Sequence, residues 1–140
     1  MLFRSRGEAA KNGVSVEMQL AEGLALIHGD RVQLQQVALN LILNAVEAMS
    51  SVDGARRELS ISTGRRAADE VLVTVRDSGR GIDPEHLERV FDSFYTTKPG
   101  GIGLGLAICR SIVDAHGGRL WAAPNEPRGA AFHFTLPAGN

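Results

Sequence analysis

A chain of 140 residues is long enough to bury one self-sufficient core, so we expect a single domain over residues 1–140. Its 15 Lys and Arg residues nearly balance its 16 Asp and Glu residues, and the formal net charge of -1 gives no overall attraction to nucleic acid or to an anionic membrane. The single cysteine excludes an internal disulfide, and no apolar run reaches the roughly 18 residues of a membrane span. We therefore expect a cytoplasmic domain without direct membrane contact, even where its parent protein is attached to a membrane.

The first part of the chain predicts strands followed by a helix. Apolar and polar residues alternate over 14–20, which is the period of a half-buried strand, and 24–27 is interpreted as a second short strand. We expect residues 1–12 to be frayed. Asp30 is placed to cap a helix over 31–49, in which apolar residues recur at helical spacing.

The middle of the chain predicts a pair of strands and a short helix. Apolar and polar residues alternate on both sides of a polar break at 64–69, and the second run ends at Asp77. Asp83 and Pro84 then begin a helix over 83–91, because Asp can cap a helix and Pro suits the first helical position.

The last part of the chain predicts one more helix and two closing strands. Residues 103–116 continue as a helix, which Gly117 and Gly118 can end in a left-handed turn. Strands are expected over 119–123 and 130–136. Strands therefore lie on both sides of each helix along the chain, and we expect an α/β sandwich with a mixed sheet.

Four polar residues share one face of the helix predicted over 31–49. They are spaced four, four and three residues apart, and they are Gln36, Asn40, Asn44 and Glu47. The ordinary interpretation is a solvated helix face. Asn is a poor helix former, however, and amide oxygens on one face are suited to binding Mg²⁺, a cation that prefers oxygen and keeps bound water and substrate phosphates.

Asp77 begins the sequence Asp-Ser-Gly-Arg-Gly, which leads from a predicted strand directly into Gly79 and Gly81. Glycines at this point let the backbone turn sharply and let a flat ligand lie close to it. The simpler interpretation is a turn that ends the strand. A carboxylate at the base of a pocket can also accept a hydrogen from the exocyclic amino group of adenine, which guanine presents differently.

A glycine-rich segment precedes the last predicted helix. Its glycines Gly101, Gly103 and Gly105 indicate a phosphate site at the helix N-terminus or, alternatively, a flexible hinge. The run 91–100 before it has aromatic residues at one end and glycines at the other, which is the composition of a lid over a ligand. Lys98 in this run is either a phosphate contact or a solvated loop charge.

Taken in order, these pieces resemble the N box, the first glycine box, the F box and the second glycine box of the catalytic domain of sensor histidine kinases. The motifs are Gln36-x-x-x-Asn40-Leu-x-x-Asn44-Ala, Asp77-x-Gly79-x-Gly81, Phe91-x-x-Phe94-Tyr95-Thr96-Thr97-Lys98 and Gly101-x-Gly103-Leu104-Gly105-Leu106. The resemblance covers about residues 30–136 and looks like the nitrogen-regulation and oxygen-sensing subgroup. It implies the Bergerat-type ATP-binding fold shared with gyrase, Hsp90 and MutL-type ATPases, in which about three helices cover one face of a mixed, mostly antiparallel sheet.

The resemblance also implies roles for individual residues. Asn44 would bind Mg²⁺ with Asn40 nearby, Asp77 would hydrogen-bond the adenine of ATP, and Lys98 would contact phosphate during catalysis. Ala130 stands where the final strand of the family has Thr, a replacement expected to change little chemistry. The remaining residues expected to contact the nucleotide are Gly79, Gly81, Phe94, Thr97, Gly101, Gly103, Leu104 and Gly105.

Asn40 distinguishes a kinase from a hydrolase. The related ATPases have a glutamate at this position to activate water, whereas an amide cannot take a proton at neutral pH. The resemblance therefore implies that the γ-phosphate passes to a histidine on a separate helical dimerisation domain and then to a response regulator. No histidine here has the His-Glu-x-x-Asn-Pro context of that phosphoacceptor, so we expect structural histidines. The resemblance also implies a monomeric catalytic domain, because the helical domain drives dimerisation in this family. The alternatives are an anti-sigma-type serine kinase and a catalytically silent nucleotide-binding module.

Overall fold

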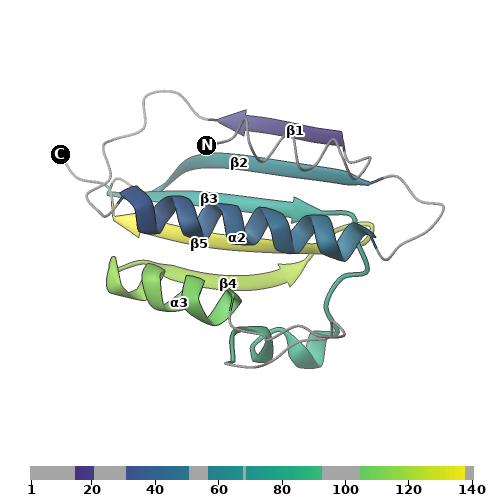
Figure 1. Cartoon of the computed structure of the whole chain (residues 1–140). Helices are drawn as coiled ribbons and strands as arrows, with labels where there is room; N and C mark the ends of the chain where they lie inside the picture. The colour runs from purple at the N-terminus through teal and green to yellow at the C-terminus, as the bar shows by residue number, and fades with distance from the viewer. Residues whose placement is uncertain (1–14, 21–30, 51–56, 68, 93–104, 138–140) are drawn as a thin grey trace.

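The computed structural model describes residues 15–20, 31–50, 57–67, 69–92 and 105–137. Its five described strands form one sheet in the order β1-β2-β3-β5-β4 (Figure 1). They are β1 (Ser15–Leu20), β2 (Glu58–Ala67), β3 (Glu70–Asp77), β4 (Arg119–Pro124) and β5 (Ala130–Pro137). β1 runs parallel to β2 and the other neighbouring strands are antiparallel, which confirms the predicted mixed, mostly antiparallel sheet.

Two α-helices cover one face of this sheet, α2 (Arg31–Ser50) and α3 (Gly105–Ala115) (Figure 1). The predicted two-layer α/β sandwich is therefore confirmed. Within the described residues it has two α-helices, where about three helices were expected. The helix predicted over 83–91 is instead a pair of short 3-10 turns, η1 (Pro84–His86) and η2 (Arg89–Phe91).

The segment after Asp83 forms short turns because few of its side chains are buried. Oδ1 of Asp83 accepts a hydrogen bond from the backbone N–H of Glu85 at 3.1 Å, so the predicted cap is confirmed. η1 buries no side chain, and η2 buries Val90 and Phe91. An α-helix is stabilised by packing a long apolar stripe, and this segment offers a single buried turn.

α3 ends at the predicted glycine pair. Gly117 has a left-handed φ of 77°, and its N–H donates a hydrogen bond to the carbonyl oxygen of Asp114 at 3.0 Å. The N–H of Gly118 donates to the carbonyl oxygen of Val113 at 2.9 Å. These two bonds are the Schellman motif, which satisfies carbonyl groups left unpaired at a helix end.

β2 continues through much of the segment predicted as a break at 64–69. Gly64 pairs with Leu72 of β3, and the strand ends at Ala67 after a shift in register. Residues with polar side chains form the backbone hydrogen bonds of a ladder as well as apolar residues do. The exposed end of the strand therefore lacks the alternating apolar pattern by which a strand is predicted. Two predictions lie outside the described residues, namely the strand over 24–27 and the fraying of 1–12.

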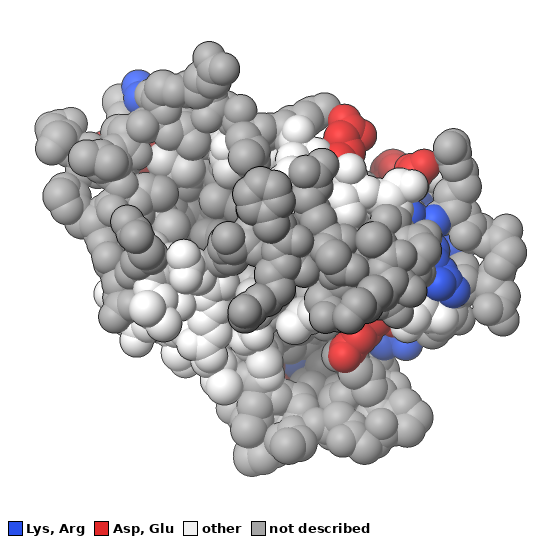
Figure 2. Space-filling model, turned by 45° about the horizontal axis from the view of Figure 1, so that its top comes forward, with Lys and Arg blue, Asp and Glu red and all other residues white. Residues whose placement is uncertain are grey.

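The described surface is mixed in charge on the face shown in Figure 2. Basic and acidic side chains lie close together near one side of the molecule, and the described residues of this face form no broad area of one sign. This distribution agrees with the formal net charge of -1. No helix in the described ranges has both the length and the apolar character needed to cross a membrane.

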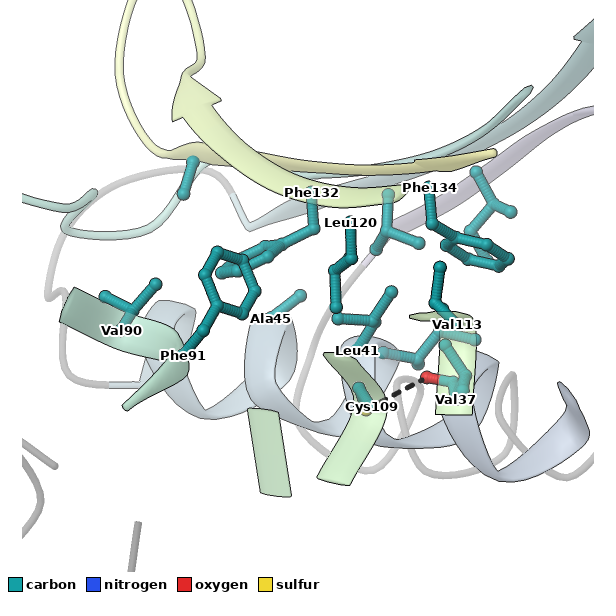
Figure 3. Packing of buried hydrophobic residues seen from close by; sticks show 14 of the residues in the cluster. Val37, Leu41, Ala45, Val90, Phe91, Cys109, Val113, Leu120, Phe132 and Phe134 are labelled. Carbon is teal, nitrogen blue, oxygen red and sulfur yellow. Dashed lines mark hydrogen bonds between the residues drawn. The ribbon is translucent and has the colours of Figure 1, made fainter. Parts of the chain in front are cut away.

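The hydrophobic core lies between the sheet and the two helices (Figure 3). Val37 and Leu41 point from α2 toward Phe132 and Phe134 of β5. Phe91 of η2 packs edge-on against Phe132, with ring centroids 6.1 Å apart and an interplanar angle of 85°. Burying one large apolar side chain contributes about 1.5–3 kcal/mol, so the packing of these core residues fixes α2 and η2 on the sheet.

Candidate functional site

Asp77, the last residue of β3, is a buried carboxylate with one unsatisfied oxygen. Only 1% of the residue is exposed. Its Oδ1 accepts hydrogen bonds from the backbone N–H of Gly79 at 2.8 Å and of Ala130 at 3.3 Å. Its Oδ2 is buried and has no hydrogen-bond partner among the described residues. An unpaired buried oxygen is costly, so Oδ2 is an acceptor available to a bound molecule.

Burial also changes the acidity of this group. It raises the pKa of the Asp77 carboxyl above the ordinary value of 3.8, because a charge is poorly solvated in the interior. The backbone N–H groups of Gly79 and Ala130 and the charge of Arg80 oppose this rise in pKa, and burial is the larger effect. A ligand that donates a further hydrogen bond would therefore stabilise the carboxylate.

The turn after Asp77 is packed tightly on both sides, which explains its glycines. A Cβ atom on Gly79 would lie 2.7 Å from the carbonyl oxygen of Ala48 in α2, closer than real side chains approach. Gly81 has a left-handed φ of 78°, and a Cβ atom there would lie 3.1 Å from the carbonyl oxygen of Gly129. The turn is thus held between α2 and the hairpin that joins β4 to β5.

The polar stripe predicted on the first helix lies on α2. Asn40 and Asn44, in the middle of the stripe, are half-buried. Gln36 and Glu47, toward its ends, are exposed. The centre of the stripe is therefore partly enclosed, unlike a fully solvated helix face.

Asn40 connects this stripe to α3. Burial raises the pKa of the Cys109 thiol in α3 to about 11, and the side chain of Asn40 opposes this rise in pKa. The thiol itself donates a weak hydrogen bond to the carbonyl oxygen of Val37 in α2 at 3.9 Å (Figure 3). The same α2 helix touches the Asp77 turn through Ala48, near its other end. One rigid helix therefore spans the distance between α3 and the buried carboxylate.

α3 begins at Gly105, the last glycine of the second glycine box. Gly105 is exposed, and a Cβ atom there would meet nothing within 4 Å. Packing against the described residues therefore does not explain a glycine at this position. The other residues predicted for the lid and the glycine box lie outside the described residues, namely Phe94, Thr97, Lys98, Gly101, Gly103 and Leu104.

The described residues are compatible with a Mg²⁺ ion held by few protein ligands. They contain no group of three or more His, Cys, Asp and Glu side chains arranged to hold a metal. Mg²⁺ needs few protein ligands when it keeps water and substrate phosphates, and it accepts amide oxygens. The half-buried amides of Asn40 and Asn44 fit that requirement.

Two residues contact the turn at Asp77 and were not predicted from the sequence. The side-chain amide of Asn125 donates to the carbonyl oxygen of Asp77 at 2.9 Å, and Nε of Arg128 donates to the carbonyl oxygen of Ser78 at 2.9 Å. Residues 125–129 have the composition of a turn, and nothing local indicates which distant carbonyl groups their side chains reach.

The described histidines are held within the fold or lie in a short turn. Nδ1 of His116 is 2.8 Å from a carbonyl oxygen of α3, and Nδ1 of His133 is 2.9 Å from the hydroxyl oxygen of Thr74. His86 lies in η1, and His28 is outside the described residues. The two paired histidines agree with the structural roles predicted for them.

Relatives of known class match most of the chain. A family model described as histidine kinase-, DNA gyrase B-, and HSP90-like ATPase matches residues 29–140. The sensor protein FixL of Bradyrhizobium diazoefficiens is 45% identical over 132 residues, a match that covers 94% of this chain. The chain spans 26% of the length of FixL.

Solved structures of histidine kinases share the fold. The nucleotide-free catalytic domain of histidine kinase ThkA has a TM-score of 0.83 and 34% identity, covering 97% of this chain and 88% of that one. ThkA in complex with the response regulator protein TrrA has a TM-score of 0.79 and 30% identity, covering 98% of this chain and 38% of that one. The chain belongs to the histidine kinase-, DNA gyrase B- and HSP90-like ATPase family, and within it to the ATP-binding catalytic domains of sensor histidine kinases.

Proposed function

We propose that this domain binds Mg·ATP and donates the γ-phosphate to a histidine on a separate helical dimerisation domain, from which the phosphate passes to a response regulator. The observation that carries the proposal is the buried, unpaired Oδ2 of Asp77. It lies in a turn packed against α2, the helix that bears the two asparagines. A nucleotide base at the turn would thus be bound next to a helix suited to a metal and phosphates.

Asp77 would accept a hydrogen bond from the exocyclic amino group of adenine at Oδ2. Guanine carries a carbonyl oxygen at the corresponding position, which would face the carboxylate without a hydrogen to donate. The adenine bond would satisfy Oδ2, a buried side-chain oxygen that has no hydrogen-bond partner among the described residues. Gly79 and Gly81 would let the base lie close to the backbone of the turn.

Asn44, with Asn40 nearby, would hold Mg²⁺ through the amide oxygens of the stripe. When bound, the ion would neutralise negative charge on the phosphates. Asn40 itself favours transfer over hydrolysis, because its amide cannot take a proton from an attacking water. We therefore expect slow hydrolysis, which leaves the terminal phosphate for an outside nucleophile.

The lid and the second glycine box would surround the phosphates. Lys98 would contribute a positive charge, and the backbone N–H groups at Gly101, Gly103 and Gly105 would bind phosphate oxygens at the start of α3. Phosphoryl transfer depends chiefly on positioning and on charge neutralisation, which these groups would provide. Phe94, Thr97 and Leu104 would complete the nucleotide contacts.

The proposed partners are the histidine-bearing domain of the same kinase and a response regulator. ThkA has been solved in complex with its response regulator TrrA, and FixL is named a sensor protein. We propose the same class of partner for this chain, with a cytoplasmic location, a monomeric catalytic domain and no nucleic-acid partner. The near-balanced charge supports the last point.

The test uses an intact kinase in which this domain is joined to its histidine-bearing domain. With γ-labelled ATP we expect an acid-labile phosphohistidine, and Asn40→Glu should shift label from the protein to free phosphate. Gln35→Ala is the matched control, since this exposed residue lies on another face of α2 and should leave labelling unchanged. Acid-stable phosphoserine would indicate an anti-sigma-type kinase, and an unlabelled protein would contradict phosphoryl donation.

A further inference from the structure

The hairpin between β4 and β5 hydrogen-bonds the chain just beyond the end of the ladder between β3 and β5. The last backbone pair of that ladder joins Arg76 to Ala131. Beyond it, the carbonyl oxygen of Asp77 accepts a hydrogen bond from Nδ2 of Asn125 at 2.9 Å, and the carbonyl oxygen of Ser78 accepts one from Nε of Arg128 at 2.9 Å. Side chains therefore replace the missing ladder bonds at two consecutive carbonyl groups.

The hairpin is itself a closed unit that touches the turn through its backbone. The N–H of Asn125 donates to the carbonyl oxygen of Gly129 at 3.0 Å, which closes the loop. Gly129 has a φ of 102°, and a Cβ atom there would collide with the carbonyl oxygen of Asp77. The next residue, Ala130, donates its N–H to Oδ1 of Asp77. The hairpin thus contacts both the backbone and the carboxylate of Asp77.

These contacts determine where the free oxygen points. The carboxylate has one oxygen bound by the N–H groups of Gly79 and Ala130, so the position of the turn relative to the hairpin sets the direction of Oδ2. Asn125 and Arg128 join the hairpin to the backbone of the turn, so they fix the positions of those two N–H groups relative to each other. A hydrogen bond between a base and Oδ2 requires correct distance and angle, so small movements of the turn weaken it.

We propose that Asn125 and Arg128 are positioning residues that orient Asp77 and thereby determine the preference of this site for adenine over guanine. The inference rests on the proposed role of Asp77 in binding adenine. Neither side chain needs to touch the nucleotide, since each acts on a backbone carbonyl of the turn. A purely structural role would lower stability and leave the discrimination between bases unchanged.

The experiment compares dissociation constants for ATP and GTP, measured by displacement of a fluorescent trinitrophenyl derivative of ATP from the 140-residue chain. Asn125→Ala and Arg128→Ala should each raise the dissociation constant for ATP about fivefold, which is the effect of one hydrogen bond. The dissociation constant for GTP should stay unchanged. Arg128→Lys keeps the charge and lacks Nε, so it should behave as Arg128→Ala does. Glu126→Gln, an exposed change in the same loop, is the matched control and should behave as wild type.

The ratio of the two dissociation constants is the decisive quantity. A partly unfolded variant binds both nucleotides less, so the ratio within each variant remains a valid measure. If Asn125→Ala and Arg128→Ala keep the wild-type ratio while Asp77→Asn abolishes it, the positioning role is wrong and the adenine role stands. If wild type has no preference for ATP, or Asp77→Asn keeps it, the proposed function of Asp77 is itself wrong.

Discussion

The backbone N–H of Gly79 donates a hydrogen bond to Oδ1 of Asp77 across 2.8 Å, so the carboxylate is held by the turn that it begins. The second oxygen, Oδ2, is buried without a partner among the described residues. The described residues thus satisfy one oxygen of the carboxylate and not the other. This asymmetry has consequences for stability as well as for binding.

Asp77→Asn should change how stability depends on pH. Because burial raises the pKa of Asp77, the folded chain keeps a proton that the unfolded chain releases as pH rises above the ordinary value of 3.8. The free energy of unfolding contributed by this group therefore falls with rising pH until the raised pKa is passed. As pH rises above the ordinary value of 3.8 and through the raised pKa, the variant should gain stability relative to wild type, measured by urea unfolding over this range. A difference that is constant over this range would refute the argument, because the amide substitution alone gives a constant offset.

His133→Gln should have the opposite dependence. Burial, followed by the charges of Arg76 and Arg66, lowers the pKa of His133, so the unfolded chain binds a proton first as pH falls through 6.5. The contribution of His133 to the free energy of unfolding should fall on acidification from about pH 7 to pH 5, so wild type should lose stability relative to the variant. Urea unfolding at the two pH values measures this difference. Equal changes in stability in the two proteins would show that His133 does not titrate as stated.

Gly79→Ala should disturb the contact between the turn and α2. The added Cβ atom would lie 2.7 Å from the carbonyl oxygen of Ala48, which belongs to helix backbone and cannot move freely. We expect a loss of about 1–3 kcal/mol in the free energy of unfolding, together with weaker nucleotide binding. Gly64→Ala is the control, because a Cβ atom there meets nothing within 4 Å. Equal effects of the two substitutions would contradict the packing described for the turn.

The thiol of Cys109 should be unreactive in the folded chain. The residue is fully buried between α2 and α3, and burial raises its pKa from 9.0 to about 11, which reduces the thiolate about a hundredfold. Because this is the single cysteine, labelling with a thiol reagent reports this site alone. We expect slow labelling in buffer and rapid labelling in urea. Rapid labelling without denaturant would mean that the packing of α3 on α2 is wrong.

Local patterns predicted those features whose cause is local. The alternation of apolar residues located β3 and its end at Asp77, and helical spacing located α2 to within one residue. Gly117 predicted the left-handed end of α3 because few other residues adopt that conformation. Ordered motifs added the family, which no single motif establishes.

Features that depend on distant contacts were not predictable in the same way. Asn125 and Asp77 are 48 residues apart, and only the register of β3 with β5 brings them together. The hydrogen bond from the thiol of Cys109 to the carbonyl oxygen of Val37, at 3.9 Å, likewise depends on how α3 packs on α2. The segment after Asp83 forms only short turns because it buries the side chains of a single turn. A capping residue predicts where a helix begins but not how many of its side chains are buried.

The central claim is that Asp77 binds the adenine of ATP, and it is tested most directly by nucleotide displacement. ATP and ADP are titrated against the trinitrophenyl derivative of ATP bound to wild type and to Asp77→Asn. We predict that both nucleotides displace the probe from wild type, and that both bind the variant at least about tenfold more weakly, because a hydrogen bond to a charged group is lost. Failure of ATP and ADP to displace the probe from wild type, or equal affinity for wild type and the variant, would contradict the claim.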